Sequence, residues 1–320
     1  MERLALSIQT REYLYSPQIT GELLLERPRR GAPGKLRFGL LNDDVISFHE
    51  GDNVVLSQGD EILFSGFVFS KRRQFGKTIT VTAYDQLRYL KNRDIYVYGG
   101  LTAAQLVRQV AGDWGIRCGE IQNTGYAIPE RLENGRPLLD IIQTALDLTE
   151  EQTGELFVLY DEAGELQLRH VRDLSLDTLI HEGSIVNFDY TSSIDRNTYS
   201  AVRLYRPDRS YGETLFFEDR REDLIERWGN LRRFERLDEG LEGQETARRI
   251  LEQRGRKSRQ LSIVKAAGDT RVRGGSMLPV DLHLGDVVVG EFLLVERVLH
   301  RFSEGGHTMD MTLVGGEFVD

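Results

Sequence analysis

The sequence predicts a mainly β protein with an α+β insertion, in which two tube-like β-barrel domains are related by an internal pseudo-repeat. Three features of the 320 residues support this fold class. Residues 2–84 and most of the last third read as short strands separated by turn residues, a pattern typical of closed or nearly closed barrels. Amphipathic helices are concentrated in the middle third. The two strand-rich ends also share residues at matching spacing.

The N-terminal strands are predicted by alternation of apolar and polar side chains. Leu4, Leu6 and Ile8 alternate with less apolar neighbours, as in a half-buried strand. Further strands are expected over residues 18–27, 34–41, 53–57, 61–72 and 77–84. An open sheet edge would recruit other chains, so closure is favoured. We therefore expect residues 1–85 to form the first tube-like β-barrel.

The pattern changes at Asp85, which can cap a short helix over residues 86–91. Thr102 and Gln105 form a capping box, and the helix behind them has an apolar face that ends at Trp114. The other elements expected here are a helix from about 137, where a proline suits the first turn, to 151, and hairpin strands over 156–161 and 165–171. We assign residues 86–190 to an α+β insertion domain.

Strands return in the last third of the chain. They are expected over residues 199–205, 214–217, 260–267 and within 280–313, with helices over 223–228 and 243–254. Residues 191–320 are therefore assigned to a second tube-like β-barrel, with a helical insertion near residues 218–255.

The two strand-rich ends share residues at a constant offset. The matched pairs are Glu61 with Glu291, Leu63 with Leu293, Val68 with Val298, Gly76 with Gly306, Thr78 with Thr308, and Thr82 with Thr312. An earlier block, Gly51, Asp52, Val54 and Val55, matches Gly285, Asp286, Val288 and Val289 at a different offset. A true duplication explains these matches, but period-2 patterning also makes any two amphipathic hairpins look alike. A duplicated chain would present twice as many similar faces as its oligomer has subunits.

Composition disfavours several classes of protein. The net charge of -10 disfavours phosphate binding, and with it sequence-specific DNA recognition. Cys118 is the single cysteine, so neither an intrachain disulfide nor a multi-thiolate zinc site can form. No apolar run approaches the roughly 18 residues that a membrane span needs. The N-terminus lacks the features of a signal peptide, so we expect assembly in the cytoplasm.

A search for catalytic, cofactor-binding and metal-binding residues assigns none. His300, His307 and Asp310 can approach one another across the last hairpin, but packed or solvent-facing histidines are favoured over a metal site. Adjacent carboxylates, which glycosidase chemistry would need in a cleft, occur at Asp43-Asp44, Glu150-Glu151 and Glu222-Asp223. Basic clusters occur at Arg27, Arg29 and Arg30; at Lys71, Arg72 and Arg73; and at Arg248, Arg249, Arg254, Arg256, Lys257 and Arg259. Solvated surface or contact with an acidic neighbouring subunit is the favoured interpretation, because no aromatic residues are interleaved for single-strand binding.

Three segments carry a family resemblance. They are residues 82–92 (TAYDQLRYLKN), residues 139–149 (LDIIQTALDLT), and the closing His300, Phe302 and residues 306–313 (GHTMDMTL). Together and in this order they resemble the YqbQ/XkdQ-like tail proteins of Gram-positive prophages. The resemblance spans essentially the whole chain.

The resemblance implies a structural baseplate hub, similar in fold to late-control tail proteins and to the hub half of VgrG spikes. It implies a homotrimer with two barrels per subunit, which joins a six-fold tail tube to a three-fold spike or tail-tip protein. Other baseplate and LysM-type tail proteins would be neighbours, DNA would pass transiently through an axial channel, and an acidic channel wall would adhere to it weakly. An infectious phage, a tail-like bacteriocin and another contractile injection system all fit. The expected location is the host cytoplasm during assembly and the particle baseplate afterwards.

Two other functions are weighed against the hub. One is a peptidoglycan hydrolase that acts during entry, since family members are commonly labelled hydrolases. The other is a carbohydrate-binding module, for which Tyr13, Tyr15, Tyr96 and Tyr98 would supply aromatic residues. No residues support hydrolysis, and tyrosines in strands more often pack than bind, so we expect a non-enzymatic protein with no cofactor.

Overall fold

The computed structural model describes residues 4–41, 46–73, 78–195, 197–208, 213–237, 240–284 and 288–315. Its largest element is a 13-stranded sheet that contains strands from both ends of the chain. The strands follow one path, β14-β18-β21-β20-β3-β4-β7-β6-β5-β1-β2, with β19 and β13 attached through β20. In chain order these are β1 (Leu4–Gln9), β2 (Leu14–Tyr15), β3 (Ile19–Pro28), β4 (Lys35–Leu41), β5 (Asn53–Gln58), β6 (Glu61–Arg73), β7 (Thr78–Tyr84), β13 (Ile180–His181), β14 (Asn187–Ser193), β18 (Ser258–Ala267), β19 (Met277–His283), β20 (Val288–Ser303) and β21 (Gly306–Val314).

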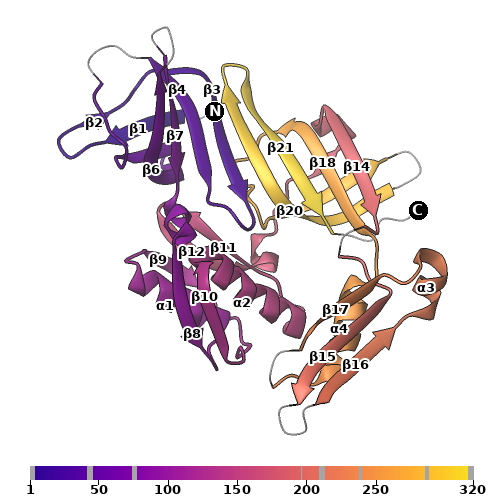
Figure 1. Cartoon of the computed structure of the whole chain (residues 1–320). Helices are drawn as coiled ribbons and strands as arrows, with labels where there is room; N and C mark the ends of the chain where they lie inside the picture. Colours follow the sequence, from indigo (N-terminus) through magenta and orange to yellow (C-terminus); the bar gives the residue numbers. More distant parts are fainter. Residues whose placement is uncertain are drawn as a thin grey trace.

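The large sheet has an N-terminal half and a C-terminal half, each with its own core (Figure 1). In the N-terminal half, Ile79, Val81 and Ala83 are buried, as the alternation of β7 predicts. The neighbours in this half run β3-β4-β7-β6-β5, and those in the C-terminal half run β14-β18-β21-β20-β19. Every pair along both runs is antiparallel. The pairing of β20 with β3 joins the halves.

The β6–β7 hairpin and the β20–β21 hairpin each contain a bulge, and the two hairpins occupy the same place in the strand order of their halves. In the N-terminal half, Val68 pairs with Ala83 and Ser70 pairs with Thr82, so one residue of β6 is skipped. In the C-terminal half, Val295 pairs with Leu313 and Arg297 pairs with Thr312, so one residue of β20 is skipped. Such a bulge bends a strand and increases its twist.

The mainly β class with helices in the middle third is confirmed. Within the described residues, however, no pairing joins the β14 end of the path to its β2 end, and the strands do not close a barrel by hydrogen bonds. The sheet is therefore described as an open path with two halves.

The middle third forms an α+β unit around a single core. Its elements are η1 (Gln86–Lys91), β8 (Arg93–Tyr98), α1 (Ala103–Asp113), β9 (Cys118–Ile121), β10 (Arg131–Pro137), α2 (Leu138–Thr153), β11 (Phe157–Glu162) and β12 (Glu165–His170). The Thr102–Gln105 capping box is present at the start of α1, and α2 begins directly after Pro137. Trp114 was expected on the apolar face of α1, but it follows the last helical residue and is 36% exposed. The helix expected over residues 86–91 is a 3₁₀ helix.

A smaller unit is inserted in the sequence between β14 and β18 and has its own core. It contains β15 (Ala201–Asp208), β16 (Glu213–Arg220), α3 (Glu222–Trp228), β17 (Arg232–Arg236) and α4 (Gly243–Arg254). The three strands form a sheet in the order β16-β15-β17, and α4 packs on β15 and β16. Short turns η2 (Val171–Leu174) and η3 (Glu182–Ser184) flank β13 on the way from the α+β unit. No helix among the described residues has the length and hydropathy of a membrane span.

Candidate functional site

Buried polar residues gather where the two halves of the large sheet meet the α+β unit. Arg27 of β3 is the central cation of this polar junction. Its guanidinium donates to the carbonyl oxygen of Thr270 at 2.8 Å and also to that of Leu63. Burial lowers the pKa of Arg27 to about 9, which still leaves the side chain charged at neutral pH. Arg27 thus connects the loop before β19, in the C-terminal half, to β6 in the N-terminal half.

Asp85 is the buried carboxylate of the polar junction. Its Oδ2 accepts from the backbone N–H of Gly34 at 2.7 Å, and its Oδ1 accepts from that of Leu87 at 3.0 Å. The N-cap role predicted from the sequence is therefore confirmed. Burial, followed by the nearby Asp161 carboxylate, raises the pKa of Asp85 well above its ordinary value. Burial also raises the pKa of Asp161 to about 6. The two carboxyls oppose each other's ionisation.

Arg273 connects the same loop to the α+β unit. Its guanidinium lies 4.2 Å from the centre of the Tyr160 ring and forms an ion pair with Glu162 at 2.9 Å. Both partners belong to β11. The polar junction therefore joins the N-terminal half, the C-terminal half and the α+β unit through the loop before β19, which binds Arg27 by a backbone carbonyl and β11 by the Arg273 side chain. This arrangement suits a rigid connection rather than a substrate cleft.

His300 and His307 form a hydrogen-bonded pair beside this loop. Nε2 of His300 lies 2.9 Å from the carbonyl oxygen of Val272, so it carries the proton, and Nδ1 accepts from Nε2 of His307 at 3.0 Å. Burial lowers the pKa of His300 well below its ordinary value and that of His307 to about 4. Both rings are neutral at pH 7, and the His307 ring stacks on Phe302.

Asp310, the third residue of the candidate metal site, lies elsewhere. It forms an ion pair with Arg301 at 2.8 Å and accepts from the backbone N–H of Lys265. In the part of the chain that the structure describes, no three potential ligands lie close enough together to hold a metal ion. The histidine pair is part of the packing of the C-terminal half.

Three of the adjacent carboxylates of the sequence analysis form ion pairs with arginines. Glu151 pairs with Arg233 at 3.1 Å, which joins α2 to β17. Glu222 and Asp223 pair with Arg220 and Arg221 at the start of α3. Asp43 and Asp44 lie outside the described residues.

The basic clusters are dispersed by the fold. Arg27 is partly buried in the polar junction, Arg29 pairs with Glu296 at 2.7 Å, and Arg30 pairs with Asp147 at 3.3 Å. Of the other clusters, Lys71 lies over the Phe48 ring, and Arg249 binds the C-terminal end of α2 through Gln152. These arginines hold units of the chain together and do not form one continuous basic surface.

Cys118 is exposed, and partial burial of its thiol raises its pKa, so it lacks the features of a catalytic thiolate. Of the four tyrosines considered for sugar binding, Tyr96 and Tyr98 are buried. Tyr13 is 61% exposed and lies beside Tyr15 near β2.

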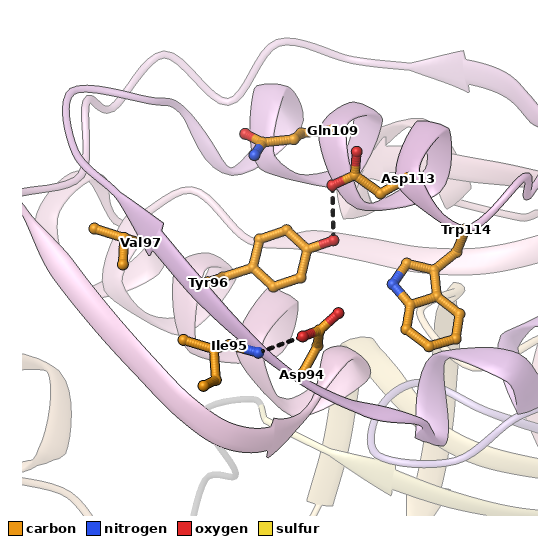
Figure 2. A pocket seen from close by; sticks show the side chains of 7 residues that line it. All are labelled: Asp94, Ile95, Tyr96, Val97, Gln109, Asp113 and Trp114. Atoms are coloured by element: carbon orange, nitrogen blue, oxygen red, sulfur yellow. Dashed lines mark hydrogen bonds between the residues drawn. The ribbon is translucent and has the colours of Figure 1, made fainter.

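An open groove of about 490 Å³ runs between β8 and α1 (Figure 2). Asp94, Asp113 and Trp114 line it, and the Tyr96 hydroxyl donates to Asp113 at 2.8 Å. Burial and this hydrogen bond raise the pKa of Tyr96 to about 12. The groove contains two carboxylates and an indole but no nucleophile paired with a base, so its chemistry suits contact with a cationic group.

The model of the family described as YQBQ-like matches residues 24–314. The chain belongs to the YQBQ-like family. It is 31% identical over 302 residues to the phage-like element PBSX protein XkdQ of Bacillus subtilis, covering 91% of this chain and 90% of that protein. It is 29% identical over 306 residues to the uncharacterized protein YqbQ of the same organism, covering 92% of each chain.

The fold of this YQBQ-like chain also occurs in solved tail proteins. The 43 kDa tail protein of prophage MuSo2 from Shewanella oneidensis has a TM-score of 0.70 at 14% identity, with 97% of this chain and 98% of that chain covered. The c3393 protein of E. coli, a component of the type VI secretion system with structural similarity to the T4 tail proteins gp27 and gp5, has a TM-score of 0.53 at 9% identity. That likeness covers 98% of this chain and 77% of the E. coli chain. These likenesses concern the fold.

The first of the three segments that resemble the family forms part of the polar junction. Residues 82–92 contain the end of β7, the buried Asp85 and η1, and the Asp85 carboxylate binds Gly34 across the N-terminal half. The sequence identified Asp85 only as a helix cap. The contacts of Arg27 and Asp85 with distant backbone groups have no signal in the local sequence, because Thr270 and Gly34 are 243 and 51 residues away from them.

Proposed function

We propose that this YQBQ-like protein is a structural baseplate hub of a phage or phage-like contractile tail. In this role three copies form an adaptor that joins the six-fold tail tube to the three-fold spike or tail-tip protein. The observation that carries the proposal is the repeated strand order of the large sheet, β3-β4-β7-β6-β5 and β14-β18-β21-β20-β19. Two similar lobes in one chain allow a three-fold ring to present six similar faces.

The bulges support an internal pseudo-repeat of the two halves. Aligning the two hairpins at their bulges equates Ala83 with Leu313 and Thr82 with Thr312. This alignment of β7 with β21 has the same residue offset as the matches found in the sequence. The same alignment equates Val68 with Val295. The sequence analysis matched Val68 with Val298 instead. The hairpin register therefore moves the match between β6 and β20 by three residues. Two unrelated hairpins have no reason to share strand order, direction and bulge position.

The proposed domains are those expected from the sequence: two tube-like barrels over residues 1–85 and 191–320, with an α+β domain over residues 86–190 between them. The one adjustment is that β13 and β14 belong to the sheet of the second barrel. In a ring, neighbouring copies would cover the open ends of the sheet that hydrogen bonding within one chain leaves unpaired. The unit with β15, β16 and β17 would project from the second barrel as its insertion.

The proposed partners are the tail tube, the spike or tip, and other baseplate and LysM-type tail proteins. The likeness to the MuSo2 tail protein supports a place in a tail, and the likeness to the E. coli secretion component supports a place near a gp27-like hub. DNA would pass through the axial channel, and assembly would take place in the host cytoplasm before incorporation into the particle.

We propose a mechanical rather than catalytic role. Of the carboxylates that hydrolysis would draw upon, Glu151, Glu222 and Asp223 form ion pairs with arginines, and two of the four tyrosines proposed for sugar binding are buried. Both observations weaken the alternative functions, a peptidoglycan hydrolase and a carbohydrate-binding module. Purified protein should leave no clear zone on cell-wall agar, and a cleared zone would favour the hydrolase.

Electron microscopy of the purified protein tests the hub directly. We expect rings with three-fold symmetry and six similar lobes around a central opening. A monomer at all accessible concentrations, or a ring whose subunits each contribute one lobe, would contradict the proposal.

A further inference from the structure

One face of the small three-stranded sheet is covered by its own chain. Val202 and Leu204 of β15 are buried in the core that includes residues of α4. Arg233 of β17, which pairs with Val202 and so lies on the same face, forms an ion pair with Glu151 of α2 at 3.1 Å. The two helices therefore lie on one side of this sheet, and its other face is directed away from them.

The other face consists of residues that alternate with the buried ones. Residues directly opposite one another in a sheet share a face. Written from β16 through β15 to β17, the rows of this face are Arg220–Ala201–Arg232, Glu218–Arg203–Phe234 and Phe216–Tyr205–Arg236. Phe216 and Phe234 are 50% and 56% exposed. Large aromatic side chains are therefore left uncovered on one continuous surface.

Arginine and aromatic side chains contact one another on this surface. The Phe234 ring stacks on the Tyr205 ring with ring centres 5.1 Å apart. The Arg203 guanidinium lies 4.3 Å from the centre of the Phe216 ring. Such residues are enriched at the energetic centres of protein interfaces. We define the arginine–aromatic face by Arg203, Tyr205, Phe216, Arg232, Phe234 and Arg236.

Cations outnumber carboxylates on this surface. The three rows contain four arginines and one carboxylate, Glu218, which lies 3.7 Å from Arg203. Arg220, at the edge, pairs with Glu222 of α3 at 2.7 Å. Arg232 is exposed and forms no ion pair within the described parts of the chain. Because the whole chain has a net charge of -10, this surface is a local exception to an acidic protein.

The chemistry of the arginine–aromatic face favours a protein segment over a nucleic acid. Base stacking needs an open face of an aromatic ring. Here Tyr205 covers one face of the Phe234 ring, and Arg203 covers one face of the Phe216 ring. The net negative charge of the chain also opposes the approach of a phosphate backbone. A segment with carboxylates and apolar side chains can instead pair with the arginines and pack on the exposed parts of the rings.

We propose that the arginine–aromatic face is a docking surface for an acidic segment of another protein. Carboxylates of the segment pair with Arg232 and its neighbouring arginines, and apolar side chains of the segment pack on Phe216 and Phe234. Charge complementarity identifies this class of partner, because the face presents excess cations beside half-exposed rings. Figure 1 shows the small unit at one end of the molecule, where such a segment can reach it.

The place of this partner in a tail rests on the proposed function. In a baseplate hub, the small unit would bind the acidic protein at the periphery while the large sheet forms the ring. The docking surface lies entirely on three strands of one chain. It can therefore be tested separately from ring formation.

Fluorescence anisotropy with a labelled peptide tests the docking surface on the full chain. The probe is a fluorescein-labelled peptide that repeats the unit Glu-Leu-Glu-Ser. It is compared with the same peptide carrying glutamine in place of each glutamate, and with an oligothymidine strand of the same length. The variants are Arg232→Glu and Phe234→Ala. Arg248→Glu is the matched control, because it makes the same change of charge at an exposed position of α4, on the covered side of the sheet.

We expect the acidic peptide to bind the wild type at least about ten-fold more tightly than it binds the glutamine peptide or the oligothymidine. Arg232→Glu and Phe234→Ala should each weaken binding of the acidic peptide by about ten-fold, and Arg248→Glu should leave it unchanged. Circular dichroism checks that each variant is folded. Equal binding of the two peptides, equal binding to the wild type and both variants, or no saturable binding would overturn the proposal.

Two further outcomes would overturn it in favour of a different occupant. Tighter binding of the oligothymidine, weakened by the same two variants, would identify a nucleic acid. Rings that dissociate in Arg232→Glu or Phe234→Ala but not in Arg248→Glu would identify a second copy of the chain. A wild-type protein that stays monomeric in electron microscopy but binds the acidic peptide as expected would contradict the hub and leave the docking surface standing.

Discussion

Substitution of Gly34 by alanine tests the packing at the polar junction. An added Cβ would lie 2.4 Å from Oδ2 of Asp85, well inside van der Waals contact. The backbone of Gly34 is not in the left-handed region, so alanine is disfavoured by this contact alone. To relieve it, Asp85 must move away from the N–H groups of Gly34 and Leu87, which it now binds at 2.7 and 3.0 Å.

The magnitude follows from these contacts. Overpacking a tight site costs about 1–3 kcal/mol, and each hydrogen bond lost from a buried group costs about 1 kcal/mol. We therefore expect Gly34→Ala to lower the free energy of unfolding by about 3 kcal/mol. Asp85→Ala loses both hydrogen bonds but removes a buried carboxylate, so we expect a loss of about 2 kcal/mol.

The double variant separates this explanation from a general effect of alanine. Without the Asp85 carboxylate the new methyl group meets little, so Gly34→Ala should cost less than about 1 kcal/mol in the Asp85→Ala background. Gly112→Ala in α1 is the matched control, because its Cβ would meet nothing within 4 Å, and it should be neutral or slightly stabilising. Urea denaturation at one protein concentration, followed by circular dichroism, measures the wild type and the four variants. Additive losses in the double variant would refute the proposed clash.

Three further predictions concern the same region. Asp161, with its pKa raised to about 6, binds its proton more tightly when folded, so it contributes stability that is lost as pH rises from about 4 to 6; Asp161→Asn should reduce this loss in pH-dependent denaturation. His307, with its pKa lowered to about 4, contributes stability that is lost as pH falls from about 6.5 to 4, and His307→Phe should reduce that loss in the same measurement. Arg27→Met leaves buried carbonyls without donors and should lower the thermal midpoint by several degrees, whereas the exposed Arg37→Met should not.

Elements with local chemical signals were predictable from the sequence. The alternation of Ile79, Val81 and Ala83 predicts β7 and its buried face, and Thr102 with Gln105 predicts the start of α1. Asp85 predicts the start of the short helix behind it. In each case the deciding interactions lie within one strand or one helical turn.

Elements without an apolar pattern were missed. β17 reads Arg-Arg-Phe-Glu-Arg and β10 contains an Asn-Gly pair, so neither resembles an alternating apolar strand. β17 is stabilised by pairing with β15 and by the Arg233 ion pair to α2, which are both distant in sequence. The contact of Arg27 with Thr270 was missed for the same reason, since the two residues are 243 positions apart.

The seam between β3 and β20 determines the angle between the two halves of the sheet. Six residue pairs, from Arg297 opposite Pro28 to Phe302 opposite Leu23, join the strands along this seam. Three ion pairs reinforce it: Arg29 with Glu296 at 2.7 Å, Arg297 with Glu26 at 2.6 Å, and Arg301 with Glu22 at 3.0 Å.

This seam bears on how three copies would match a six-fold tube. In the proposed ring of three copies, six lobes would make six contacts with their neighbours. Half of these contacts would lie within a chain, where the strand pairing of β3 with β20 and the polar junction fix the geometry. The other half would lie between copies, where only non-covalent docking is available. A ring with six similar lobes therefore requires the contacts between copies to reproduce an angle that each chain already fixes.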